Sequence, residues 1–278
     1  MLKLGSGKSL NISKWVKKDA GVLFVSSKAP VTCSPEQRIK DIAHILASKY
    51  RRLPVMDESG QLRGILSGTD ILKLLVGMTK KKRGMRSPAD MKVKDVMNHH
   101  VVNIDKNMKL EDVIDFFKKH RRGAYPVTYR KKLVGLVSEW DLVRQLRGNT
   151  GVRVSDVMVK KPIIAREDFS VADTAKMFAM GGFRRLPVAK GGILIGIVTA
   201  RDILGFLVRN RLLGKLPEQR QNIGKIIVRE VSATTADADI YEAAKVMVSE
   251  RVGGLPVVED HELTGILTER DIVDVIEF

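Results

Sequence analysis

The chain repeats one sequence pattern four times, and this repetition constrains its fold more than any other feature. Each copy holds a Pro-Val pair followed by a Gly-x-x-Ser/Thr-x-x-Asp segment. The proline and aspartate of the four copies are Pro54 and Asp70, Pro126 and Asp141, Pro187 and Asp202, and Pro256 and Asp271. Their separation is 16 residues in the first copy and 15 in the other three. Such agreement identifies an internal repeat.

Apolar periodicity predicts the same elements in each repeat. Ahead of the first proline, Ile39, Ile42, Ala43 and Leu46 follow the i, i+3, i+4, i+7 spacing of one helix face. The equivalent segments are residues 110–117, 171–178 and 240–247. After the helix, residues 53–56 and 62–66 are predicted as two short strands, and a second helix begins near the aspartate. A strand–helix–strand–strand–helix unit of about 60 residues is too small to bury its own sheet face and needs a partner repeat.

The repeats alternate in type, which indicates that a two-repeat module was duplicated. The first and third repeats carry an arginine pair directly before the Leu-Pro-Val strand, whereas the second and fourth carry Gly123 and Gly253 three residues before the proline. We therefore expect two modules, residues 1–148 and 149–278. Their repeats are expected at about 20–78 and 92–148, and at about 152–209 and 222–278.

Several function classes are disfavoured by what the sequence lacks. A single cysteine, Cys33, excludes a disulfide framework and any Cys-cluster metal site. The apolar stretches are far shorter than the roughly 20 residues that cross a bilayer, and residues 1–13 have no apolar core of signal-peptide type. No phosphate-binding Gly-Lys-Ser/Thr loop, nucleophile elbow or His-Glu-x-x-His motif is present. We expect a soluble, cytoplasmic, non-catalytic protein without metal, cofactor or membrane partner.

The four motifs resemble those of tandem cystathionine-β-synthase (CBS) domains, arranged as two Bateman modules in one α/β chain. The resemblance rests on the Pro-Val strands and on residues 64–70, 135–141, 196–202 and 265–271. The layout is similar to that of the gamma subunit of AMP-activated protein kinase. It implies that the modules form a disk within one chain or that two chains pair as a homodimer. It also implies clefts for AMP, ADP, ATP or an S-adenosyl compound, and an energy-sensing role exerted on a regulated partner protein.

The Ser/Thr-x-x-Asp segment has a chemical interpretation of its own. It begins where a strand gives way to a helix, and free N–H groups at a helix N-terminus favour an anionic or polar ligand. The carboxylate can accept hydrogen bonds from ribose hydroxyls. The candidate ligand-binding residues are Ser67 and Asp70, Ser138 and Asp141, Thr199 and Asp202, and Thr268 and Asp271. The alternative interpretation is a helix capping box, which is compatible with ligand binding.

The arginine pairs are candidate phosphate ligands, because the guanidinium fork matches phosphate oxygens. In the family pattern, basic residues directly before the Leu-Pro-Val strand face the nucleotide phosphates. Arg51, Arg52, Arg184 and Arg185 occupy these positions. Side chains alternate along an extended segment, so we expect one arginine of each pair to face the cleft and the other to face solvent. Gly123 and Gly253 in the other repeats allow a close backbone approach.

The charge distribution suggests a second function. The formal net charge is +17, and residues 1–150 account for all of it, with 31 Lys and Arg against 14 Asp and Glu. The basic segment that links the first two repeats includes Lys80, Lys81, Lys82 and Arg83, which are candidate nucleic-acid contacts. The alternative is a solvated face that keeps the protein soluble. Aromatic residues are only 5% of the chain, and no nucleic-acid recognition motif is present, so the sequence favours the nucleotide hypothesis.

Overall fold

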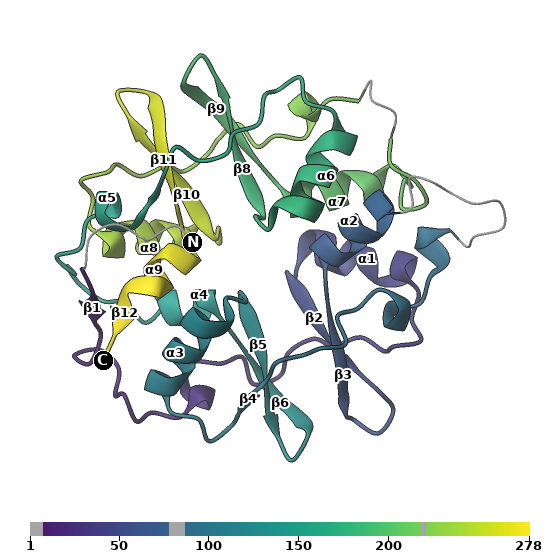
Figure 1. Ribbon diagram of the computed structural model, residues 1–278, viewed down its shortest axis with the longest axis horizontal. Coiled ribbons are helices and arrows are strands. Elements are labelled where there is room, and N and C mark those ends of the chain that lie inside the picture. The colour runs from purple at the N-terminus through teal and green to yellow at the C-terminus, as the bar shows by residue number, and fades with distance from the viewer. Residues whose placement is uncertain (1–7, 78–86, 218–220) are drawn as a thin grey trace.

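The four repeats form a flat ring. The computed structural model describes residues 8–77, 87–217 and 221–278, and Figure 1 shows the ring viewed down its shortest axis. Around it the repeats follow the order first, second, fourth, third. Of the two arrangements that the resemblance implies, closure of the modules within one chain is therefore the one observed.

Each repeat is an antiparallel hairpin flanked by two helices, as the sequence predicts. The hairpins are β2 (Arg52–Met56) with β3 (Leu62–Ser67), β5 (Ala124–Tyr129) with β6 (Lys132–Ser138), β8 (Arg185–Lys190) with β9 (Ile193–Thr199), and β10 (Gly254–Glu259) with β11 (Glu262–Thr268). The helices ahead of them are α1 (Ile39–Ser48), α3 (Leu110–His120), α6 (Val171–Gly181) and α8 (Ile240–Ser249). The helices that follow are α2 (Gly68–Gly77), α4 (Glu139–Val143), α7 (Ala200–Arg209) and α9 (Glu269–Val275). The predicted apolar stripe of α1 is buried.

The first strand of each repeat is shorter than expected. In the second repeat it is β4 (Ile104–Asp105), parallel to β5. In the other three it is a single parallel bridge, from Cys33, Ala165 or Thr234 to the valine of the Pro-Val pair. Each hairpin has a register shift directly after that valine. Such a bulge bends the strand at the place where the short first strand pairs with it.

Helix packing joins repeats from different halves of the sequence. Helix α1 packs on α7 and α2 packs on α6, so the first repeat shares a core with the third. Helix α4 packs on α9, and a second core joins the second repeat to the fourth. Each core therefore contains side chains from both predicted modules. Burying helix faces across the module boundary stabilises the closed ring.

Strand edges join the repeats within each half. Bridges from Ser27 to Leu136 and from Ile65 to Asn98 connect the first two repeats. In the second half, β7 (Val159–Lys160) pairs with β11, and Ile197 is bridged to Val228. Sheet contacts thus define two sequence halves, and helix contacts close them into the ring.

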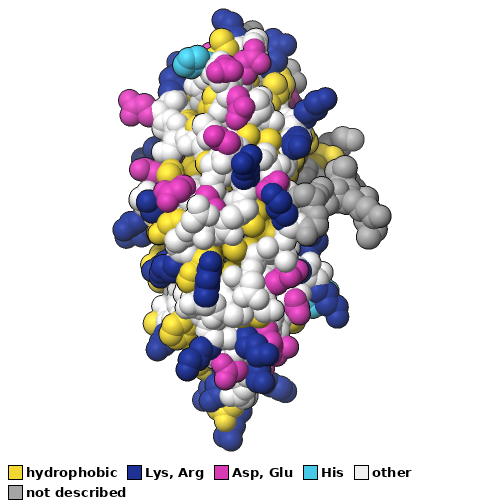
Figure 2. Space-filling model, turned by 90° about the vertical axis from the view of Figure 1, so that its left-hand side faces the viewer, with side chains coloured by type: hydrophobic (Ala, Val, Ile, Leu, Met, Phe, Trp, Pro, Cys, Tyr) yellow, Lys and Arg dark blue, Asp and Glu magenta, His cyan; other side chains and the backbone are white. Residues whose placement is uncertain are grey.

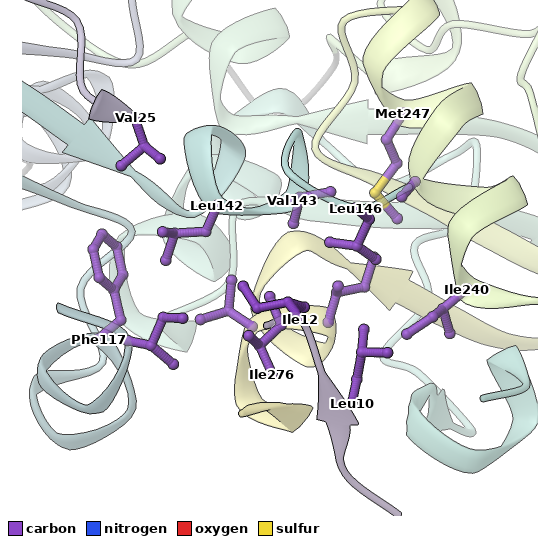
Figure 3. Close-up of a cluster of buried hydrophobic side chains, with 14 of the residues drawn as sticks. Leu10, Ile12, Val25, Phe117, Leu142, Val143, Leu146, Ile240, Met247 and Ile276 are labelled. Carbon is purple, nitrogen blue, oxygen red and sulfur yellow. The ribbon is translucent and has the colours of Figure 1, made fainter. Parts of the chain in front are cut away.

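The two ends of the chain are held together. Strand β1 (Leu10–Asn11) runs parallel to β12 (Ile276–Glu277). Figure 3 shows Leu10 and Ile12 among the buried side chains of the second core, which include Leu146, Ile240 and Ile276. The remaining short elements are η1 (Val22–Phe24), η2 (Pro88–Asp90), η3 (Val93–Asp95), α5 (Val154–Val157) and η4 (Ile223–Lys225). None of the described helices is both long and apolar enough to cross a membrane.

Candidate functional site

A cavity of about 680 Å³ occupies the middle of the ring and is lined by all four repeats. We call it the central cavity. One end is formed by the start of α2 with the loop at residues 98–102, and the other by the start of α7 with residues 228–232. A second cavity of about 250 Å³, here the side cavity, lies between the third and fourth repeats and is lined by residues that include Pro162, Ile163, Ile266, Thr268 and Asp271.

All four predicted arginines line the central cavity, so the expectation that one of each pair faces solvent is wrong. Arg52 and Arg185 begin strands β2 and β8, but Arg51 and Arg184 precede them. Strand alternation therefore does not apply to the first arginine of each pair. Arg51 reaches across the ring to the fourth repeat, and Arg184 reaches to the second. The flexible stems of both side chains allow these long reaches.

Gly123 and Gly253 make room for the arginines. A Cβ on Gly123 would stand 2.7 Å from Nη1 of Arg184 and 2.8 Å from Nη2 of Arg52. A Cβ on Gly253 would stand 2.5 Å from Nη2 of Arg185 and 2.7 Å from Nη2 of Arg51. Arg185 also donates a hydrogen bond to the carbonyl of Gly253. The second and fourth repeats thus carry glycines where the first and third carry arginine pairs, and these glycines leave space for the arginine side chains.

Two buried glutamates, which the sequence analysis missed, accept hydrogen bonds from the arginines. Nη1 of Arg51 lies 2.8 Å from both carboxylate oxygens of Glu269. Glu139 accepts from Arg270 at 2.8 Å, and Nη2 of Arg184 lies 3.4 Å from it. Both glutamates stand directly after the Ser/Thr of the motif in the second and fourth repeats, where the other repeats have Gly68 and Ala200. This alternation, opposite to that of the arginine pairs, is the signal that would have found them.

The cluster carries more positive than negative charge. Its guanidinium groups are those of Arg51, Arg52, Arg184, Arg185 and Arg270, and its carboxylates are those of Glu139 and Glu269. Burial, together with the neighbouring Arg184, lowers the pKa of Arg52 to about 9. Burial also lowers the pKa of Arg185 to about 10, although Glu269 opposes the shift. Both groups are still cationic at neutral pH, so the cavity favours an anionic ligand.

Neither Arg185 nor Arg52 forms an ion pair with a carboxylate of the described residues. Arg185 donates to the carbonyl of Gly253, which leaves Arg52 as the unengaged cation of the cluster. Its guanidinium makes no hydrogen bond or ion pair within the described part of the chain.

Burial would raise the pKa of Glu139, but Arg184 and Arg270 hold that pKa below its ordinary value. Glu139 is therefore ionised and already engaged. An incoming anion thus finds one free guanidinium group and several engaged ones.

The four Ser/Thr-x-x-Asp motifs are capping boxes, as the alternative interpretation predicts. One carboxylate oxygen, Oδ2, accepts both the backbone N–H and the hydroxyl of the Ser or Thr. The two distances are 2.8 and 2.6 Å for Asp70, 2.9 and 2.5 Å for Asp141, 2.8 and 2.6 Å for Asp202, and 2.7 and 2.7 Å for Asp271. Within the described residues the other oxygen, Oδ1, accepts no hydrogen bond. Capping therefore leaves one acceptor oxygen on each aspartate.

The motifs are placed differently with respect to the cavities. Ser67 and Asp70 line one end of the central cavity, and Thr199 and Asp202 line the other. Thr268 and Asp271 line the side cavity. Ser138 and Asp141 line neither of these two cavities. Burial raises the pKa of Asp141, and it raises that of Asp271 to about 6.

Three further sequence interpretations concern residues outside this cluster. The candidate nucleic-acid contacts Lys80, Lys81, Lys82 and Arg83 lie outside the described residues. Among the residues that are described, no group of His, Cys, Asp and Glu is arranged to hold a metal ion. Cys33 is buried, and burial raises the pKa of its thiol to about 11, so it is a small core residue rather than a reactive thiol.

The four repeats match a known protein family, and two relatives match most of the chain. The CBS domain family model matches residues 22–77, 93–148, 154–209 and 223–277. Protein MJ1225 of Methanocaldococcus jannaschii is 27% identical over 269 residues, which cover 90% of this chain and 96% of the relative. A 33.4 kDa protein in the ribosomal RNA operon of Thermofilum pendens is 25% identical over 241 residues, with 81% and 80% coverage.

Two solved structures share the fold over nearly the whole chain. The crystal structure of MJ1225, a protein proposed to be an archaeal homolog of g-AMPK, has a TM-score of 0.81 at 25% identity and covers 91% of this chain and 99% of that one. A conserved protein of Pyrococcus horikoshii has a TM-score of 0.62 at 21% identity and covers 92% and 99%. The second likeness concerns the fold alone.

Proposed function

This chain belongs to the CBS domain family, and on that premise we propose that it is a non-catalytic regulatory protein that binds an adenine nucleotide in its central cavity. The observation that carries the proposal is the convergence of Arg51, Arg52, Arg184 and Arg185 on one cavity. Phosphate groups suit such a cluster, because each guanidinium offers paired donors with fixed spacing. The free guanidinium of Arg52 gives the first phosphate a ready partner.

The two ends of the central cavity suit the nucleoside part of such a ligand. Asp70 and Asp202 each keep one carboxylate oxygen for the ribose hydroxyls, as acidic residues do in other nucleotide sites. Near them, Val101 and Val102 line one end, and Val228 and Val231 line the other. Apolar walls with a few polar groups are typical of small-molecule sites, and they suit a purine ring.

The charge of the central cavity favours a nucleotide over an S-adenosyl compound. A sulfonium cation would be repelled by the arginines, whereas phosphates would be attracted. Thr268 and Asp271 remain candidate ligands in the side cavity. For Ser138 and Asp141, capping is the role that their hydrogen bonds support.

The likeness to MJ1225 supports the regulatory part of the proposal, because that protein is itself proposed as a homolog of g-AMPK. A regulatory protein of this kind signals when a ligand binds two conformations with different affinity. The regulated partner is a protein that would contact the ring in one of these conformations.

Isothermal titration of the purified chain with AMP, ADP, ATP and S-adenosylmethionine tests the proposal. We expect heat of binding for at least one phosphate-bearing ligand, and weaker or no binding of S-adenosylmethionine in the central cavity. Absence of any heat or thermal shift up to about 1 mM, a concentration at which only ligands weaker than about 4 kcal/mol would escape detection, would refute it. Unchanged nucleotide after prolonged incubation, followed by chromatography, tests the non-catalytic part.

A further inference from the structure

Two ion pairs at the wall of the central cavity are pseudo-symmetric mates, with the arginine of each pair lining the cavity. Arg51 and Arg184 stand at the same position of the first and third repeats, three residues before the proline, and Glu269 and Glu139 stand at the same position of the fourth and second. Each pair joins one half of the sequence to the other: Arg51 to Glu269 at 2.8 Å and Arg184 to Glu139 at 3.4 Å. The same contact has therefore formed twice, across the boundary between the modules.

The two members of each pair differ in exposure. The side chains of Glu269 and Glu139 are only 4% and 3% exposed, whereas those of Arg51 and Arg184 are 33% and 35% exposed. Both arginines line the central cavity. An anion that enters the cavity therefore meets the guanidinium groups first, while the carboxylates lie behind them.

We propose that Glu139 and Glu269 are resident counter-anions of the arginine cluster, and that an anionic ligand binds by taking Arg51 and Arg184 from them. Phosphate and carboxylate both bind the paired donors of a guanidinium group, and in this proposal the phosphate group replaces the carboxylate. The inference deepens the proposed function and rests on it, because it assigns to the ligand's phosphates the arginines that now pair with glutamates.

This exchange also couples ligand binding to the contacts between the two modules. Bound phosphate would loosen two contacts that join the first half of the chain to the second. Ligand occupancy would then alter how the two halves are held together, which is what a sensor needs to transmit its state.

The two exchanges are unequal. Among the residues that the structure describes, Glu139 contacts Arg184 and Arg270, whereas Glu269 pairs with Arg51 alone. The residue equivalent to Arg270 in the second repeat is Trp140, whose ring centre lies 5.8 Å from the guanidinium carbon of Arg51. Nη1 of Arg51 lies 2.8 Å from both oxygens of Glu269, whereas Nη2 of Arg184 lies 3.4 Å from Glu139. Removal of Arg51 would leave Glu269 without an arginine partner among the described residues, whereas Glu139 would keep Arg270 after removal of Arg184.

A double-mutant cycle tests the exchange, with inorganic tripolyphosphate as the probe, since it requires no nucleoside site. Four proteins are titrated by calorimetry: the unchanged chain, Glu269→Gln, Arg51→Gln and the double variant. We expect Glu269→Gln to bind tripolyphosphate about tenfold more tightly, the change that corresponds to one charge-assisted hydrogen bond. In the Arg51→Gln background the same substitution should change affinity less than about twofold.

The matched control is Glu262→Gln, which removes the same charge from an exposed position at the start of β11. It should leave tripolyphosphate affinity unchanged. Circular dichroism verifies that each variant folds, and the Arg184 and Glu139 pair supplies the same cycle if Arg51→Gln does not fold. An unaltered affinity in Glu269→Gln would overturn the proposal. An equal increase in the Arg51→Gln background would also overturn it, since that result indicates long-range electrostatics alone.

A parallel titration with AMP, ADP and ATP separates this inference from the proposed function. Binding of any of the three together with a failed tripolyphosphate cycle would leave nucleotide binding intact and refute the exchange. The expected cycle without binding of AMP, ADP or ATP would support the exchange and refute nucleotide binding.

Discussion

The backbone of Gly123 lies so close to Arg184 that a Cβ at this position would stand 2.7 Å from the guanidinium Nη1. The two residues belong to different halves of the sequence, yet each determines what the other position can hold. The equivalent contact in the other two repeats is between Gly253 and Arg51, where a Cβ on Gly253 would stand 2.7 Å from Nη2 of Arg51. The ring therefore places glycine backbone against arginine side chains at two equivalent points.

We expect Gly123→Ala to weaken binding of ADP by about three- to tenfold, which is less than the loss of a whole charged hydrogen bond. The added methyl group pushes aside the ends of Arg184 and Arg52. Because those ends are flexible, the free energy of unfolding should change by less than about 1 kcal/mol. Gly21→Ala is the matched control, since no atom lies within 4 Å of a Cβ built there. Calorimetry that shows equal ADP affinity in both variants would contradict the prediction.

Asp202→Ala should reduce nucleotide affinity about ten- to a hundredfold, and more than Arg201→Ala does. It removes the acceptor for ribose hydroxyls, worth about 1.5–3 kcal/mol. It also removes a helix cap, worth about 0.5–2 kcal/mol of stability. Asp141→Ala separates the two effects, because Asp141 makes the same capping bonds but lines neither cavity. Equal losses of affinity in Asp202→Ala and Asp141→Ala would mean that the aspartate only caps its helix.

Joint replacement of Arg184 and Arg185 by alanine should narrow the difference between AMP and adenosine affinity. An arginine–phosphate contact adds charge-assisted bonds that adenosine cannot form. The expected loss is at least about tenfold for AMP, with little change for adenosine. Arg166→Ala is the control, because this arginine is highly exposed and its only partner among the described residues is Asp168. An unchanged ratio of AMP affinity to adenosine affinity in the double variant would show that the phosphate does not contact these arginines.

Asp271 should give the protein a distinct pH dependence. Its pKa in the folded chain is raised to about 6 by burial, above the value of about 3.9 in an unfolded chain. The folded state then holds a proton that the unfolded state has released, so this group makes stability fall as pH rises from about 4 to about 6. Above about pH 6 the contribution of Asp271 to the free energy of unfolding no longer changes with pH.

The difference in the free energy of unfolding between the unchanged chain and Asp271→Asn isolates this effect in denaturant titrations from pH 4 to 7. We expect the fall with pH to be smaller in the variant by up to about 3 kcal/mol, the value of a shift of two pKa units. Asp260→Asn, on an exposed turn, should leave the pH profile unchanged. Parallel profiles for all three proteins would show that Asp271 titrates as it does in an unfolded chain.

The repeat unit could be predicted from sequence because its signals are local. Helix periodicity, hairpin turns and the strand-to-helix change at Ser67 or Thr199 all lie within a few residues, and the observed elements follow them. The packing of the first repeat on the third could not be predicted in this way. An amphipathic stripe indicates that a helix face is buried, but not which of four similar repeats covers it.

The candidate site was predicted in part for the same reason. The arginines were recognised from their position before a strand, whereas the convergence of both members of each pair depends on how the halves close. The sequence did not indicate a role for Glu139 and Glu269, because an acidic residue in the first turn of a helix is favourable whether or not it contacts another repeat. A residue type that alternates between repeats, such as these glutamates, indicates contact between unlike repeats.

The ring also changes how nucleic-acid binding by the basic half must be tested. Each hydrophobic core contains residues of both halves, so isolated halves would expose apolar helix faces. The whole chain is therefore the right material. Figure 2 shows the edge of the ring that carries β1 and β12, where Lys and Arg side chains lie with Asp and Glu among them.

If nucleic acid binds, residues 1–148 should carry it, because the excess positive charge lies there. Affinity would then come from phosphate neutralisation, with a log–log salt slope near −0.9 per phosphate contacted on duplex DNA and little sequence preference. Replacing Lys80, Lys81, Lys82 and Arg83 by serine should flatten that slope without altering nucleotide affinity. The control removes the same charge from exposed positions of the second half, namely Lys160, Lys161, Arg166 and Lys190. Gel-shift titrations at two salt concentrations compare the two variants. Equal slopes, or no binding by the unchanged chain at low salt, would leave the charge as a feature for solubility or for docking an acidic partner.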